Sequence, residues 1–195
     1  MIKPEENPEF LNDFLAYNST ILNKSENSIK EYNYDLAHFL KFIKFKYRLT
    51  DVTDEEYIKT IKINNFDIDT LKKITLQDIH AFLQYLKTCY QSKPTTLARK
   101  ASTIRIFFKY MCNKTKILPT NPAQDLENPK LGQRLPKYLT LEQSKELLST
   151  VSDPSNNKGH GNHDNTERNY AIVTILLNCG LRLSELVNIN ISDID

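Results

Sequence analysis

The chain has 195 residues, of which 39% are hydrophobic and 26% charged, and its formal net charge is +2. These values indicate a globular chain of one or two domains. It contains no run of 18 or more apolar residues and its N-terminus lacks the pattern of a signal peptide, so we expect a cytoplasmic protein without membrane contact. The three cysteines have no C-x-x-C spacing, which favours neither a disulfide framework nor a zinc site.

The first 118 residues are predicted to form four helices. Apolar residues recur at helical spacing in residues 8–23, and more regularly from the capping signals at Ser25 and Ser28 to about Tyr47. The connection over residues 51–69 holds six acids against two lysines. We expect this acidic part of the surface to keep away from polyanions.

Thr75 and Asp78 predict the capped start of a third helix, which runs to Tyr90. The fourth helix opens at Ser92-Lys93-Pro94, because proline is tolerated in a first turn. On a helical wheel this fourth helix has an apolar face and, opposite to it, a face of hydroxyls and cations. The apolar face comprises Leu97, Ala101, Ile104, Phe108 and Met111. The opposite face comprises Thr95, Arg99, Ser102 and Lys109.

Charge is unevenly distributed around the fourth helix. No acid occurs from Ile79 to Gln124, although the mean acid content of 24 in 195 residues predicts about six in a window of this length. Such a surface attracts polyanions. An ordinary solvated helix surface is the alternative on charge alone. The residues that we predict to contact nucleic acid are Lys87, Lys93, Thr95, Arg99, Lys100, Ser102, Arg105 and Lys109.

Four of the chain's eight prolines lie between residues 119 and 136, a spacing that excludes a regular helix. We therefore predict a linker at residues 119–137 between a domain at 1–118 and a second domain at 138–195.

In the second domain, Thr140 and Gln143 predict a capping box for a helix to about Ser149. The following segment is polar, and its histidines, His160 and His163, have no partner cysteine or carboxylate pattern. We assign no metal to them.

A seven-residue motif, Gly180-Leu181-Arg182-Leu183-Ser184-Glu185-Leu186, follows an apolar helix predicted over about 168–179. Glycine accepts the left-handed conformation that ends many helices, and the next helix opens at once, which places Arg182 at the elbow. A guanidinium fixed there is suited to gripping two oxygens of a phosphate. On spacing alone, a solvated arginine near the carbonyl end of the preceding helix is the favoured interpretation.

Three segments resemble tyrosine recombinases of the Xer and phage integrase family. They are residues 170–195 with the motif, residues 98–111 of the fourth helix, and the proline-rich segment at 121–140. The resemblance implies a mainly α fold, in which a four-helix SAM-like core-binding bundle is followed by the helical N-terminal part of a catalytic domain.

The resemblance also implies a chemistry. In that family a tyrosine attacks DNA and forms a 3′-phosphotyrosyl link, without metal or other cofactor, and tetramers cut and rejoin double-stranded recombination sites. Carried over to this sequence, Arg182 holds a non-bridging oxygen of the scissile phosphate and Glu185 supports it. The nucleophilic tyrosine, the lysine, the histidine and the second arginine of the family are not matched here. We therefore expect a monomeric fragment that binds DNA without cutting it, and the sequence leaves open whether its parent resolves chromosome dimers, integrates a mobile element or inverts a segment.

Two other hypotheses remain at this stage. A helix-turn-helix transcriptional regulator would place its recognition helix at residues 183–188, although this segment offers no cation beyond Arg182. A protein-interaction module formed by the four N-terminal helices explains the basic face less well.

Overall fold

The computed structural model describes residues 3–130, 132, 137–156 and 165–193. The chain divides into two compact units, Met1–Gly132 and Gln133–Asp195. The described residues form helices and no strand, which confirms the mainly α fold class, while the SAM-like four-helix arrangement stays a prediction. Within the described ranges, no helix combines the length and the apolar content needed to cross a membrane.

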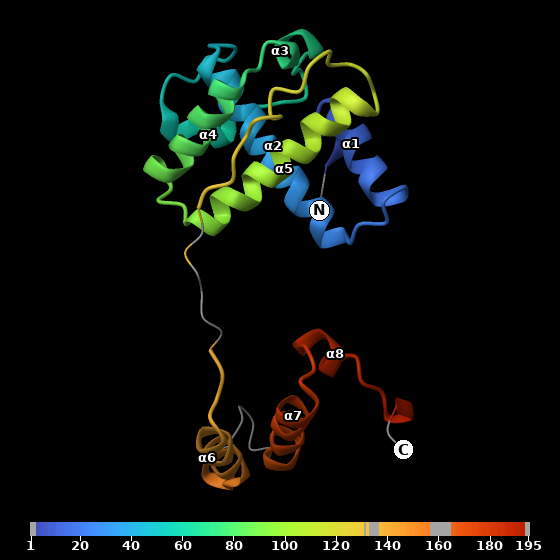
Figure 1. The fold of residues 1–195 in the computed structure, drawn as a ribbon, viewed down its shortest axis with the longest axis vertical. Helices are drawn as coiled ribbons and strands as arrows, with labels where there is room; N and C mark the ends of the chain where they lie inside the picture. Colours follow the sequence, from blue (N-terminus) through green and yellow to red (C-terminus); the bar gives the residue numbers. More distant parts are fainter. Residues whose placement is uncertain (1–2, 131, 133–136, 157–164, 194–195) are drawn as a thin grey trace. The chain divides into compact units, whose positions relative to one another are not determined.

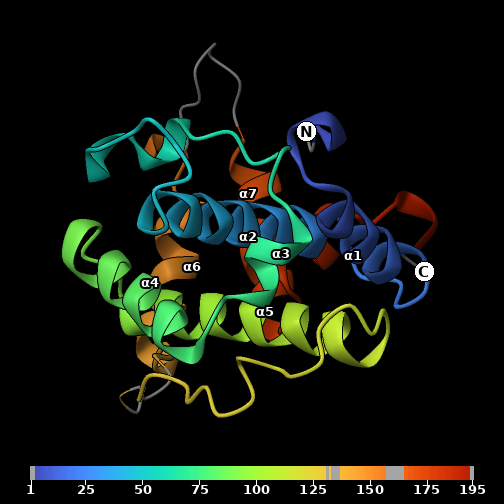
Figure 2. The ribbon, with the colours of Figure 1, turned by 90° about the horizontal axis from the view of Figure 1, so that it is seen from above.

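The first unit is built around one long helix. Its α-helices are α1 (Glu9–Thr20), α2 (Glu26–Lys46), α3 (Ile68–Lys72), α4 (Leu76–Cys89) and α5 (Pro94–Asn113), and its 3-10 helices are η1 (Pro4–Glu6) and η2 (Glu55–Thr60). The helix α2 packs against α1, α4, α5 and η2, and it is crossed by α5 (Figures 1 and 2). Ser25 caps α2 as predicted, because its hydroxyl accepts the N–H of Ser28. All four predicted helices are present near their expected ends.

The core of the first unit is largely aromatic. Its largest fully buried side chains include Phe14, Phe39, Phe82, Phe107 and Phe108. The ring centroids of Phe39 and Phe82 are 5.3 Å apart and those of Phe14 and Phe107 are 5.4 Å apart, and both pairs meet edge to face. Such pairs contribute about 0.5–1.5 kcal/mol each beyond the burial of their area. The first pair joins α2 to α4 and the second joins α1 to α5, while Phe39 and Phe108, with ring centroids 6.1 Å apart, join α2 to α5.

Asp78 joins the start of α4 to the end of α2. The predicted capping box is present, since Thr75 N–H donates to Asp78 Oδ2 at 2.8 Å and Asp78 N–H donates to Thr75 Oγ1 at 3.3 Å. Lys46 Nζ and the Tyr47 hydroxyl also donate to this carboxylate, at 2.6 and 2.8 Å. Burial alone raises the pKa of Asp78, but the donors from Lys46, Thr75 and Tyr47 outweigh it and hold that pKa below its ordinary value.

The acid-rich connection contains structure that its sequence pattern did not predict, namely η2 and α3. Its apolar residues Ile58, Ile61, Ile63 and Phe66 are buried. Lys44 Nζ binds this segment to α2 by donating to the Lys62 carbonyl at 2.9 Å and to Asn65 Oδ1 at 2.7 Å. The acids whose side chains are described, Asp51, Asp54, Glu55, Asp67 and Asp69, are exposed.

The beginning of the predicted linker packs on the first unit. Ala123 and Leu126 of the linker are buried with the core of that unit, as is Leu118 just before the linker. The division between the two units falls at Gly132, inside the predicted linker of residues 119–137. The assignment of the units to a DNA-binding domain and a catalytic domain stays a prediction.

The second unit has no buried residue in the ranges whose burial is described, 137–156, 165–190 and 192–193. It contains α6 (Leu141–Ser152), α7 (Thr166–Cys179) and α8 (Leu183–Val187), with η3 (Pro154–Asn156) and η4 (Ile191–Asp193), and α7 packs against both α6 and α8. The predicted capping box of Thr140 and Gln143 begins α6. In these three helices no described residue is buried, and the side chains of Leu183 and Val187 are more than two-thirds exposed.

Candidate nucleic-acid interface and phosphate site

The helix α5 carries most of the predicted nucleic-acid contacts, and its apolar face lies as the helical wheel predicts. The residues of that face, Leu97, Ala101, Ile104, Phe108 and Met111, are all buried. Pro94 stands in the first turn, where its missing N–H breaks no helical hydrogen bond. The opposite side of α5 is therefore left for solvent or a ligand.

Most of the predicted contact residues lie on the surface of the first unit. Lys87 lies in the last turn of α4, Lys93 is the N-cap residue of α5, and Thr95 and Lys109 lie on α5. All four are exposed, whereas Ser102 is half-buried. These residues flank the turn between α4 and α5 and continue along α5. They supply ammonium and hydroxyl groups of the kind that contact the nucleic-acid backbone.

Arg99 is exposed and also bound. Its Nη1 and Nη2 donate to the two carboxylate oxygens of Asp35 on α2, at 2.5 and 3.1 Å, which is a bidentate pair. Nη1 also forms an ion pair with Glu31 Oε2 at 2.9 Å. The side chain of Arg99 keeps 42% of its surface accessible, although both of its terminal nitrogens bind Asp35.

Lys100 does not lie on the exposed face, contrary to our prediction. The residue is 4% exposed, its Nζ donates to Asp35 Oδ1 at 2.7 Å, and the same ammonium lies 4.9 Å from the centre of the Tyr34 ring. A buried ammonium needs such partners because desolvation is costly. In this structure Lys100 is a structural cation and not a surface contact.

Arg105 is half-buried and holds the chain that follows α5. Its Nη2 donates to the Leu126 carbonyl at 2.5 Å and to Asn128 Oδ1 at 3.1 Å. The guanidinium therefore anchors the start of the predicted linker, a role that sequence spacing did not indicate. We leave Arg105 out of the contact surface proposed below.

The motif of the second unit adopts the predicted elbow. The helix α7 ends at Gly180, whose φ of 62° lies in the left-handed region, and Arg182 is the N-cap residue of α8. Glu185 braces this arginine twice: its Oε2 accepts the Arg182 backbone N–H at 2.8 Å and its Oε1 accepts Nη1 at 2.9 Å. These backbone and side-chain bonds lower the pKa of the Glu185 carboxyl, in that order of effect, so it is ionised at neutral pH.

The Arg182 side chain is 82% exposed. Its bond to Glu185 uses Nη1, and the rest of the planar guanidinium fork is accessible. An arginine presented in this way, with one edge fixed by a carboxylate, is suited to receiving the oxygens of a phosphate. Arg182 and Glu185, which we predicted as a pair, are brought together.

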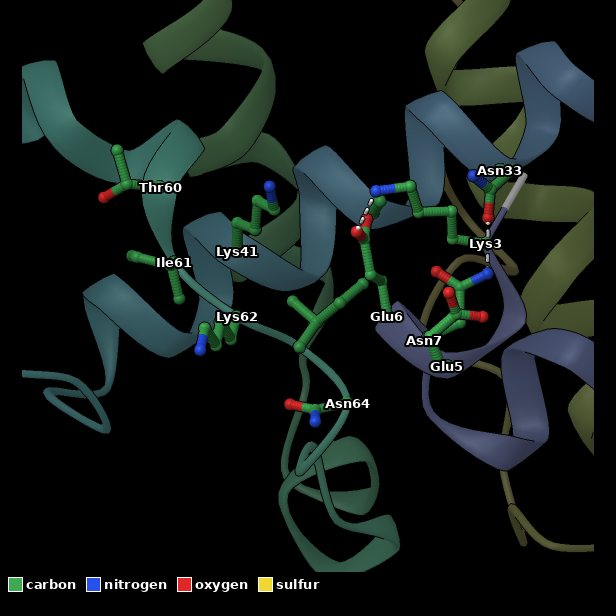
Figure 3. A pocket seen from close by; sticks show the side chains of 12 residues that line it. Lys3, Glu5, Glu6, Asn7, Asn33, Lys41, Thr60, Ile61, Lys62 and Asn64 are labelled. Carbon is green, nitrogen blue, oxygen red and sulfur yellow. Dashed lines mark hydrogen bonds and ion pairs between the residues drawn. The ribbon is translucent and has the colours of Figure 1, made fainter. Parts of the chain in front are cut away.

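A pocket in the first unit lies away from these residues. It has a volume of about 490 Å³ and is lined by η1, α2 and the chain after η2, including Lys3, Glu6, Asn33 and Lys41 (Figure 3). Its charges are mixed, since Lys3 Nζ pairs with Glu6 at 3.0 Å. Lys41 Nζ donates to the Lys59 carbonyl at 2.6 Å, and burial lowers the pKa of that ammonium. This pocket contains none of the predicted site residues.

No group of three or more His, Cys, Asp or Glu residues suited to a metal ion occurs in the described part of the chain. The two histidines of the polar loop, His160 and His163, lie outside the described residues.

Comparison with known proteins identifies the relatives of this chain. No family model matches it. Tyrosine recombinase XerC of Caldanaerobacter subterraneus subsp. tengcongensis is 43% identical over 187 residues, which cover 96% of this chain and 50% of the relative. Tyrosine recombinase XerD of Proteus mirabilis is 36% identical over 151 residues, covering 76% of this chain and 42% of the relative. The chain belongs to the Xer-like tyrosine recombinases. A solved structure, that of XerA recombinase, is 27% identical, covers 96% of this chain and 52% of that one, and has a TM-score of 0.40.

The chain spans about half the length of the curated tyrosine recombinases that it matches. Membership of this family disfavours the transcriptional regulator. The structure agrees, because the segment predicted as a recognition helix forms only the five residues of α8, and these include Glu185 and no cation.

Sequence reasoning missed two partners of Arg99, the buried Asp35 and the exposed Glu31. Both lie on α2 and bind Arg99, which is more than 60 residues away in the sequence. Their spacing of four residues places them on one face of α2. That spacing is the sequence feature from which a shared cationic partner could have been predicted. Nothing in the sequence indicates which cation of α5 forms the ion pairs.

Proposed function

We propose that this chain is the part of a site-specific DNA recombinase that binds the recombination site and supplies the first catalytic arginine. The complete recombinase cuts and rejoins double-stranded DNA through a 3′-phosphotyrosyl intermediate, without metal or other cofactor. It works in the cytoplasm as a tetramer on DNA. Because no tyrosine, lysine, histidine or second arginine of the family's catalytic set is matched here, the 195 residues alone bind DNA and do not cut it. They act as a monomer.

The observation that carries this proposal is the presentation of Arg182. The helix stop at Gly180 and the two bonds from Glu185 hold the arginine at the N-cap of α8 with an accessible guanidinium. Negative charge develops on the phosphate oxygens as the phosphodiester is attacked, and a prepositioned guanidinium stabilises it without reorganisation. Glu185 acts as a positioning residue, since it binds the arginine and not the phosphate.

DNA binding is assigned to the exposed cations and hydroxyls of α4 and α5. The contact residues are Lys87, Lys93, Thr95, Arg99, Ser102 and Lys109. Phosphate contacts of this kind supply affinity and orientation without reading the sequence. Lys100 and Arg105, which we had predicted as contacts, act instead through Asp35 and the Leu126 carbonyl.

A salt titration tests the DNA-binding half of the proposal. The 195-residue chain is mixed with a labelled duplex of random sequence, and the dissociation constant is measured by fluorescence anisotropy between 50 and 200 mM salt. Each phosphate contact contributes about −0.9 to the slope of log K against log salt. Replacing Lys87, Lys93 and Lys109 together by glutamine is expected to flatten this slope by up to about 2.7.

A matched triple variant, in which Lys62, Lys72 and Lys73 become glutamine, removes the same charge from exposed positions near the acid-rich connection. It is expected to leave the slope nearly unchanged. If both triple variants lose affinity equally, the contact surface is wrongly placed; if the wild-type chain shows no binding at 50 mM salt, the DNA-binding proposal fails.

A further inference from the structure

We propose that Asp35 positions Arg99 for the DNA backbone and that Glu31 occupies the place of a phosphate until DNA arrives. This inference rests on the proposed DNA-binding function. It assigns a role to two carboxylates of α2, inside a surface that otherwise attracts anions.

The Asp35 side chain is completely buried and is the acceptor for three side chains of α5. Besides the two Arg99 bonds, Lys100 Nζ donates to Oδ1 at 2.7 Å and the Thr103 hydroxyl donates to Oδ2 at 3.1 Å. Both carboxylate oxygens are therefore saturated. A planar carboxylate engaged in this way fixes the plane of the Arg99 fork, which a single-point contact cannot do.

Glu31 binds the same guanidinium differently. Its side chain is 59% exposed and meets Arg99 through one ion pair at 2.9 Å. Exposed pairs of this kind contribute little net stability, because water solvates both charges. A phosphate oxygen therefore displaces Glu31 readily, whereas the buried and bidentate Asp35 stays in place.

The charge balance at this site also favours replacement of Glu31 by a phosphate. Arg99 and Lys100 bring two positive charges to this site, and Asp35 and Glu31 bring two negative charges. When a phosphate replaces Glu31 at Arg99, the guanidinium keeps two anionic partners and the buried pairs are undisturbed. Glu31 thus lowers affinity for DNA until it is displaced, while Asp35 raises affinity by fixing the position and plane of the guanidinium.

A double-mutant cycle on DNA binding tests this inference. Affinity and salt slope are measured by anisotropy for the full chain and for Glu31→Gln, Asp35→Asn and Arg99→Ala, alone and in pairs with Arg99→Ala. Arg99→Ala is expected to flatten the slope by about 0.9. Glu31→Gln is expected to tighten binding about two- to threefold and Asp35→Asn to weaken it, and both effects should disappear when Arg99 is alanine, because each acts through that side chain.

Two further variants separate positioning from folding. Thr103→Val removes one hydrogen bond to Asp35 but keeps the Arg99 fork, so it is expected to lower the unfolding midpoint with no change in salt slope. If Asp35→Asn does not fold, because Lys100 loses its counter-charge, Asp35→Asn with Lys100→Met removes both buried charges and takes its place in the cycle.

The inference is overturned if Arg99→Ala keeps the wild-type salt slope, if Glu31→Gln fails to tighten binding, or if the effect of Asp35→Asn persists in the Arg99→Ala background. The proposed function is judged separately. It stands when the Lys87, Lys93 and Lys109 triple variant flattens the slope, and it falls together with the inference when the wild-type chain does not bind DNA.

Discussion

His38 makes the stability of the first unit depend on pH in a way that the structure quantifies. The residue is 7% exposed, and its Nε2 has no hydrogen-bond partner among the described residues. Aromatic rings surround it, with centroids 5.4 to 6.4 Å away, from Tyr34, Phe82, Tyr85 and Tyr90. Burial, followed by the nearby charges of Lys100, Lys59 and Lys41, lowers the pKa of His38 from 6.5 to about 4, and Asp35 opposes this shift.

The sign follows from proton uptake. Well above pH 6.5 the imidazole is neutral in the folded and the unfolded chain, so it has no effect on the free energy of unfolding. As pH falls from 6.5 to 4, the unfolded chain binds a proton that the folded chain refuses, and the free energy of unfolding drops. At about 1.4 kcal/mol per pH unit, the interval corresponds to a loss of about 3 kcal/mol.

Urea unfolding at several pH values, followed by circular dichroism, measures this loss. His38→Phe keeps an aromatic ring among the surrounding aromatic side chains and removes the titrating group. The free energy of unfolding of the wild-type chain should therefore fall by about 3 kcal/mol more than that of the variant between pH 7 and pH 4. His80 is exposed and supplies the control, since His80→Gln should follow the wild-type curve. Parallel curves for wild type and His38→Phe would refute the burial argument.

Two other substitutions test the supports of the fold. Asp78→Asn weakens a capping box and a buried carboxylate that accepts bonds from the Thr75 N–H and hydroxyl, Lys46 and Tyr47, so the free energy of unfolding in urea should fall by about 2–3 kcal/mol. Asp69→Asn, in an exposed pair, should change it by less than about 0.5 kcal/mol. Equal losses would contradict this. Gly180→Ala meets no atom within 4 Å, so its cost is the left-handed backbone alone, about 1–2 kcal/mol, and amide hydrogen exchange in α7 and α8 should quicken. Gly132→Ala has no such strain and should leave that exchange unchanged; a shared response of both variants would rule out the strain argument.

Local signals in the sequence predicted much of the fold. Capping pairs such as Thr75 with Asp78, and a glycine stop at Gly180, act over three or four residues, so they are visible without tertiary structure. The buried residues of the acid-rich connection were harder to predict. Its buried residues, Ile58, Ile61, Ile63 and Phe66, follow neither a helical nor a strand period, because loop packing on α2 decides which of them face inward.

The candidate site was predicted in part for the same reason. The wheel of α5 separated its buried and exposed faces correctly, but Lys100 entered the prediction through the acid-free window and not through the wheel. The window shows how many charges a segment carries, but tertiary contacts determine which charged residue pairs with which. Asp35 lies on another helix and could not be paired with Arg99 or Lys100 from the sequence.

The most direct test of the account is the cleavage activity of Arg182→Ala in the complete reading frame that encodes this chain. A nicked suicide substrate traps the covalent protein–DNA complex, and its rate of formation is compared with DNA affinity measured by gel shift. We expect cleavage to slow by about 10²- to 10³-fold, while affinity stays near that of the wild type. Wild-type cleavage by the variant, or a loss of binding equal to the loss of cleavage, would contradict the assignment of Arg182 to the scissile phosphate.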